Sequence, residues 1–174
     1  MRRLVCGLLT LALAGTPVLA GQQPVELGLD AGFGYKVNSP TAGIASLPVQ
    51  SFRVGFYAGD QVSIEPRLRW NLINFENENS LNSLNTEIGV LIHFSPDRNR
   101  PQPYFRPLAA LEVFNGGGGT MSQASIGGAI GVKLPVRDRF AVRLEGGFRR
   151  AFESDDFAES STIFVQVGFS FFTR

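Results

Sequence analysis

The chain has 174 residues, and its 16 basic and 15 acidic side chains give a formal net charge of +1. This length suits a single domain, and so balanced a charge gives no electrostatic basis for binding nucleic acid. After the first 20 residues no stretch has 18 consecutive apolar residues, which excludes a transmembrane helix there but leaves a membrane-spanning β-barrel open.

Residues 1–20 have the pattern of a secretory signal peptide. Arg2 and Arg3 precede a short apolar run, and the segment ends in small residues before Ala20. The run is too short to span a membrane. We therefore expect cleavage after Ala20, which leaves residues 21–174 as the only domain.

The rest of the chain alternates apolar and polar residues with a period of two, which is typical of β-strands with two different faces. In the third stretch, for example, Val62, Ile64 and Leu68 alternate with Glu65 and Arg67. The stretches cover residues 25–37, 51–59, 61–72, 84–94, 103–114, 123–134, 140–151 and 161–173. The pattern predicts eight strands and no amphipathic helix of useful length.

The connections between these strands also alternate in kind. The sequences AGDQ, SPDRNRPQ and PVRDR follow the second, fourth and sixth strands and are short or rich in proline. The sequences NSPTAGIASLP, NFENENSLNS, NGGGGTM and FESDDFAES follow the first, third, fifth and seventh strands and are longer. An up-and-down barrel with turns at one end and loops at the other has this arrangement.

The polar face of the strands has two features that indicate that it points inward. It is rich in glycine, which weakens a strand on an open surface but gives room inside a narrow barrel. It also carries nearly balanced charges, and buried charges must be paired. These charges are Lys36, Arg53, Arg67, Arg69, Arg106, Lys133, Arg143 and Arg149, against Glu26, Asp30, Glu65, Glu87, Glu112 and Glu145.

The opposite face is apolar and nearly free of charge, as a lipid-facing surface requires. The predicted fold is therefore all-β: an eight-stranded antiparallel up-and-down transmembrane β-barrel. Eight strands leave an interior that side chains fill, so we expect a plugged polar lumen. We expect a paired charge network centred on Glu65, Arg67, Arg69, Glu87, Arg106, Glu112, Arg143, Glu145 and Arg149.

A few further residues carry specific expectations. Trp70 and Tyr35 lie near strand ends and are predicted to anchor the barrel at the membrane interface. Pro66 and Pro107 fall on the outward face, where each removes a donor from the sheet. We expect a β-bulge, or an early strand position near the interface, at both prolines.

The chain contains only weak hints of chemistry. Lipid A deacylases of the outer membrane carry a His-x-Ser pair with a downstream Glu, which His93, Ser95 and Glu112 match loosely. His93 falls on the inward face, whereas attack on a lipid needs an outward site, so a structural histidine is favoured. The sequence predicts no cofactor and no metal site.

The signal peptide, the eight alternating stretches and the final STIFVQVGFSFF resemble the small bacterial outer-membrane barrels of the OmpA/OmpX type. The resemblance implies location in the bacterial outer membrane, contact with its lipid and lipopolysaccharide, and loops that face outside the cell. It also implies that the assembly machinery recognises the last strand. That strand normally ends in an aromatic residue, whereas this chain continues to Arg174.

The predicted function is a structural or interaction role through four extracellular loops whose partner the sequence does not name. The sequence leaves three further functions open: a narrow pore, a lipid A-modifying enzyme, and a soluble secreted barrel that carries an apolar ligand.

Overall fold

The computed structural model describes residues 24–37, 45–46, 51–73, 81–116 and 119–173. The predicted signal segment, residues 1–20, lies outside this part of the chain. The strands are β1 (Val25–Val37), β2 (Ala45–Ser46), β3 (Ser51–Tyr57), β4 (Val62–Ile73), β5 (Leu81–His93), β6 (Gln102–Gly116), β7 (Gly119–Arg137), β8 (Phe140–Ala151) and β9 (Ser160–Phe172). The described residues include no helix with the length and apolar character to cross a membrane.

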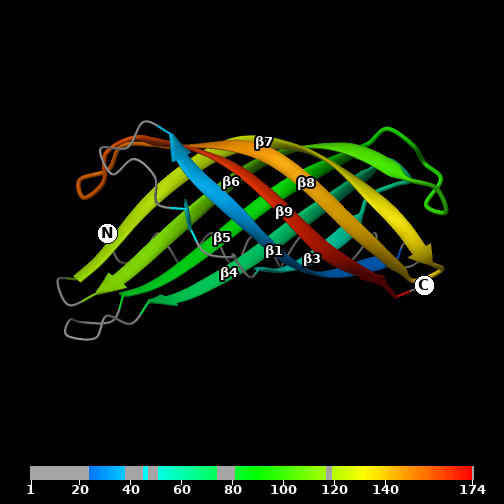
Figure 1. Cartoon of the computed structure of the whole chain (residues 1–174), viewed down its shortest axis with the longest axis horizontal. Helices are drawn as coiled ribbons and strands as arrows, with labels where there is room; N and C mark the ends of the chain where they lie inside the picture. Colours follow the sequence, from blue (N-terminus) through cyan, green and yellow to red (C-terminus); the bar gives the residue numbers. More distant parts are fainter. Residues whose placement is uncertain (1–23, 38–44, 47–50, 74–80, 117–118, 174) are drawn as a thin grey trace.

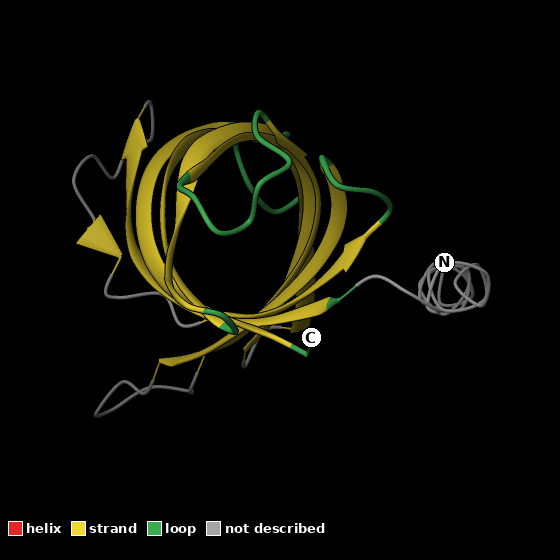
Figure 2. Ribbon diagram, turned by 90° about the vertical axis from the view of Figure 1, so that its right-hand side faces the viewer, coloured by secondary structure: helices red, strands yellow, loops and turns green. Residues whose placement is uncertain are grey.

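The long strands close into a barrel. Each pairs antiparallel with the next one, and β1 also pairs with β9 from Glu26–Phe172 to Val37–Ser161. Figure 1 shows the strands running obliquely across the molecule, and Figure 2 shows the closed ring along its axis. The short β2 pairs with β1 at Gly34 and Tyr35, beyond the residues that pair with β3. This closed pairing confirms the predicted eight-stranded antiparallel barrel. Closure satisfies the backbone groups that an open edge would leave unpaired.

The two ends of the barrel differ in their connections. Residues 58–61, 94–101 and 138–139 connect strands at one end, here called the turn end, and residues 152–159 connect β8 to β9 at the opposite end, here called the loop end. The predicted loop NGGGGTM differs from expectation, because β6 and β7 stay paired as far as Gly116–Gly119. Gly119 has a φ of 132°, a conformation that glycine adopts without steric cost. Strand pairing therefore extends into the stretch that the sequence pattern assigned to a longer loop.

The strand β7 is longer than the sequence pattern predicts, because it continues through Pro135 to Arg137. Its pairing with β8 shifts register between these two residues, which places a β-bulge at Val136. A bulge adds one residue to one strand and bends the ladder. The chain then turns at 138–139 into β8.

The expected β-bulges at Pro66 and Pro107 are absent, so that part of the prediction is wrong. Register continues without a shift through the Pro66–Ile88 and Pro107–Gly128 pairs. On the other side of each proline the ladder lacks pairs instead: the β3–β4 pairing omits Pro66, and the β5–β6 pairing omits Pro107. Because proline has no N–H, losing a pair toward one neighbour accommodates it without an extra residue.

The two faces of the barrel wall have opposite character. Large apolar side chains cover the outside, where Trp70 is 70% exposed and Phe33 is 64% exposed. Charged and polar side chains point inside and are buried, as Arg53 and Glu65 are at 0% exposure. This inside-out distribution is the one that a lipid-facing barrel needs.

Candidate functional site

The site that the fold creates is the barrel interior, here called the lumen. Alternation along every strand sends each second side chain inward, so residues from distant parts of the chain meet there. In the described part of the chain, five acids and five bases are almost fully buried in the lumen, and they are here called the lumen network. They are Glu26, Asp30, Glu65, Glu87 and Glu145, with Arg53, Arg67, Arg106, Lys133 and Arg143.

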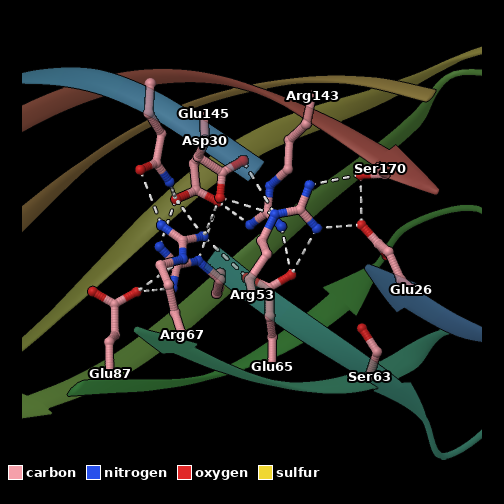
Figure 3. A network of polar contacts seen from close by, with 12 residues as sticks. Glu26, Asp30, Arg53, Ser63, Glu65, Arg67, Glu87, Arg143, Glu145 and Ser170 are labelled. Carbon is pink, nitrogen blue, oxygen red and sulfur yellow. Dashed lines mark hydrogen bonds and ion pairs between the residues drawn. The ribbon is translucent and has the colours of Figure 1, made fainter. Parts of the chain in front are cut away.

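Arg53, on β3, connects three of the acids (Figure 3). Its Nε donates to Asp30 Oδ2 at 2.9 Å, and its Nη1 donates to Glu26 and, at 3.4 Å, to Glu65 Oε2. Its Nη2 donates to Ser170 Oγ at 2.6 Å. All the nitrogens of this guanidinium are therefore used, which is the geometry for which arginine is suited.

Glu145, on β8, is a second centre of the lumen network. Arg106 donates to it through Nη2 at 2.5 Å and through Nε at 3.1 Å, in a bidentate pair. The Tyr104 hydroxyl donates to Glu145 Oε2 at 2.7 Å, and Arg143 donates to the same oxygen. Arg143 also donates to Glu65 Oε2 at 2.5 Å, so it joins the two centres.

Arg67 and Glu87 extend the lumen network toward the loop end. Arg67 Nη1 donates to Gln166 Oε1 at 3.0 Å, and its Nε lies 3.7 Å from a Glu87 oxygen. Glu87 accepts hydrogen bonds from Arg106 through one oxygen and from Arg149 through the other. One carboxylate therefore contacts three guanidinium groups.

At the turn end, Lys133 completes the network. Its ammonium donates to Glu26 Oε2 at 2.5 Å and to the Tyr57 hydroxyl at 3.0 Å. Arg98, in the connection after β5, lies 4.2 Å from the centre of the Tyr57 ring, in cation–π range.

Glycines on the inner face make room for these side chains. A Cβ on Gly168 would lie 1.7 Å from Asp30 Oδ1, and one on Gly131 would lie 2.2 Å from the Tyr104 hydroxyl. Both distances are impossible for real atoms, so the network requires bare backbone at these positions.

Most of the residues predicted for the centre of the charge network meet in the lumen, but two do not. Glu65, Arg67, Glu87, Arg106, Arg143, Glu145 and Arg149 are linked by the contacts above. Arg69 and Glu112 form no ion pair with another described residue, and Arg69 Nε has no hydrogen-bond partner among them. Both lie nearer the loop end, on the parts of β4 and β6 beyond the network.

The predicted centre omitted Glu26, Asp30, Arg53 and Lys133, which take part in the network through the contacts described above. The sequence signal that points to them is the inward parity of their strands. It does not show how far along the barrel each side chain lies, and that distance decides which charges meet.

The weakly suggested catalytic residues do not come together. His93 points into the lumen, where its Nε2 lies 3.3 Å from Ser63 Oγ and its ring stacks on Tyr57. Glu112 pairs with Asn85 toward the other end of β5. Ser95 caps the following turn by accepting a hydrogen bond from the Asp97 amide at 3.3 Å.

Both predicted interface anchors are exposed on the outer wall. Trp70 lies opposite Leu84 and Tyr35 opposite Ile163, in the parts of β4 and β1 nearer the loop end. Tyr35 is 51% exposed. Within the described residues no three His, Cys, Asp or Glu side chains gather in a way that could hold a metal ion.

Three solved structures with a similar fold are outer-membrane or bacterial surface proteins of low sequence identity. Neisserial surface protein A is 15% identical with a TM-score of 0.59, over 84% of this chain and 96% of that one. OprG from Pseudomonas aeruginosa is 6% identical with a TM-score of 0.57, over 88% and 97%. Ail of Yersinia pestis, in complex with the heparin analogue sucrose octasulfate, is 8% identical with a TM-score of 0.55, over 86% and 97%.

No curated protein matches the chain. The model of the outer membrane protein beta-barrel domain family, however, matches residues 6–171, which is nearly the whole sequence. The match agrees with the closed antiparallel barrel, its apolar outer wall and its polar interior. The chain belongs to the outer membrane protein β-barrel family, and it is a transmembrane protein of the bacterial outer membrane.

Proposed function

We propose that this protein is a structural outer-membrane barrel that does not conduct ions and that acts through its loops. The observation that carries the proposal is the lumen network. Its ten charged side chains are almost fully buried, and they form ion pairs with one another. Moving an ion through this region would require several of these contacts to open. An unpaired buried charge costs several kcal/mol, so we expect opening to be rare.

Planar-bilayer recording of the purified barrel tests this proposal. We expect no steady channel openings, because the paired side chains occupy the narrow interior of an eight-stranded barrel. Heat-modifiable migration of the same preparation on a gel serves as the control that the barrel is folded. Steady openings from folded protein would favour a narrow pore and overturn the proposal.

We further propose that the loop end faces outside the cell and the turn end faces the periplasm. The support is that the connections 38–50 and 152–159 at the loop end are longer than the turns 58–61 and 138–139, since barrels of this type have short periplasmic turns and longer outer loops. In this orientation β9 ends in the periplasm. Its outward residues Val165, Val167, Phe169 and Phe171 offer the apolar alternation that we propose the assembly machinery recognises.

A lipid A-modifying enzyme and a soluble carrier have less support. The residues of the suggested lipid A-modifying site lie apart, and His93 is buried inside the barrel rather than exposed to lipid. A soluble carrier of an apolar ligand needs an apolar interior, whereas the described inward side chains are mostly polar. We therefore propose a role in interaction rather than in catalysis or transport.

A further inference from the structure

A second group of polar side chains lies in the lumen between the lumen network and the loop end. Arg69 pairs across the sheet with Ser51 on β3 and with Asn85 on β5, and Asn85 pairs with Glu112 on β6. On the far side of the lumen, Arg149 pairs with Thr162. These residues come from six of the strands, so they form a polar belt around the inside of the wall.

Several buried atoms of this belt have no hydrogen-bond partner among the described residues. They include Arg69 Nε, Arg149 Nε, both amide atoms of Asn85, and Ser51 Oγ. Leaving such groups without partners costs about 1–3 kcal/mol each, and more for charged groups. Among the described residues, the lumen network has one such atom, Arg67 Nε, which still lies 3.7 Å from a Glu87 oxygen. Arg53 and Arg143 form hydrogen bonds through every guanidinium nitrogen.

The belt also has a surplus of positive charge. The lumen network is balanced within itself, with five acids and five bases. The belt adds Arg69 and Arg149 but only one acid, Glu112, which forms no ion pair with another described residue. Arg149 takes its partner from the lumen network by sharing Glu87 with Arg106, and Arg69 has no carboxylate within 4.0 Å among the described residues.

Both arginines line a cavity of about 60 Å³. Its lining includes Arg69, Arg149, Thr162 and Gln166, with the Phe164 ring beside the Arg149 guanidinium at 5.8 Å. Gly32 also lines it without a side chain. One water molecule needs about 10–15 Å³ of cavity volume, so this cavity has room for a group of several heavy atoms.

We propose that this cavity binds a phosphate or sulfate group. Two guanidinium groups with free donors match the oxygens of a tetrahedral anion, and the Thr162 hydroxyl adds a further donor. The anion would neutralise the surplus charge and supply acceptors for Arg69 and Arg149. This inference does not depend on whether the barrel conducts.

Direct titration of the folded barrel in detergent tests the site, with inorganic phosphate as the probe and chloride at equal ionic strength as the control. The readout is the NMR signals of the arginine Nε–Hε groups. We expect phosphate, but not chloride, to shift the Arg69 signal in a saturable way. The second arm of the experiment uses glucose 6-phosphate. If it binds, the ligand is the terminal phosphate of a larger soluble molecule; if only inorganic phosphate binds, the ligand is a free anion.

The variant Arg69→Gln should weaken phosphate binding at least about tenfold, since a hydrogen bond to a charged group contributes about 1.5–3 kcal/mol. It should still fold, because it removes a charge that has no ion-pair partner among the described residues. Arg150→Gln is the matched control: Arg150 is the next residue after Arg149 but is exposed and paired with Glu159. Absence of a phosphate-specific shift in the wild type, or unchanged affinity in Arg69→Gln, would overturn the proposal.

Discussion

At the scale of single residues, the interior of this barrel depends on exact pairing of charges. Arg53 has contacts with Glu26, Asp30 and Glu65, and all four side chains are nearly inaccessible to solvent. Taking charges out of water is costly, and only the opposite charges and hydrogen bonds around them compensate. Removing one member therefore does more harm than the loss of one contact, because its partners stay buried and unpaired.

We accordingly expect Arg53→Met to destabilise the barrel by about 3–5 kcal/mol. Arg53→Lys should recover only part of this loss, because an ammonium cannot reproduce the fork of the guanidinium. Urea unfolding followed by the fluorescence of Trp70, the single tryptophan, measures the change.

Arg150→Met is the control for this experiment, because it breaks an ion pair whose two side chains are 54% and 51% exposed. Solvent screens such a pair, so its loss should cost at most about 1 kcal/mol. Equal effects of the Arg53 and Arg150 substitutions would show that burial of the network contributes little to stability.

At the scale of the strands, the positions of the glycines decide where large side chains fit inside the barrel. Gly131 of β7 lies beneath the Tyr104 hydroxyl, and a Cβ there would also lie 2.6 Å from the Leu144 carbonyl oxygen. Gly146 of β8 lies on the outward face, and a Cβ there meets nothing closer than 3.7 Å. The same added methyl group would therefore clash at Gly131 and fit without a clash at Gly146.

We expect Gly131→Ala to destabilise the barrel by about 1–3 kcal/mol, since the neighbouring side chain and backbone must both move. Gly146→Ala should change stability by no more than about 0.5 kcal/mol, as do most surface substitutions. Parallel unfolding curves of the two variants make the comparison. A larger effect at Gly146 would mean that strand propensity, and not space in the lumen, explains the glycines.

At the scale of the whole molecule, the question is which end of the barrel faces outside. The turn end holds Asn99 and the loop end holds Asp156, and both residues are exposed. Cys6, in the predicted signal segment, is the only cysteine of the chain. After removal of that segment, a single introduced cysteine would be the only thiol that a labelling reagent can modify.

We expect Asp156→Cys to react with a membrane-impermeant thiol reagent on intact cells. Asn99→Cys should react only after the outer membrane is opened, because turns of such barrels face the periplasm. The reverse labelling pattern would contradict the proposed orientation while leaving the fold intact.

The alternation of residues along the chain was enough to predict the number of long strands and their two faces, and the glycines and balanced charges of the polar face predicted that it points inward. A residue pattern with period two puts Glu65 and Arg67 on one face and Trp70 on the other, and the charge balance and glycines of the first face then assigned it to the inside. The physical reason is that side-chain direction along a strand is a local property, set by the backbone itself.

Only the tertiary structure decided which charges meet, because stagger between strands sets the height of each side chain in the lumen. It brought Arg53 and Lys133 into the lumen network and left Arg69 beyond it, although all three share one face in sequence. It also decided that Pro66 and Pro107 interrupt pairing toward one neighbour without a bulge. These features depend on register between strands, which is a long-range property that no single stretch of sequence contains.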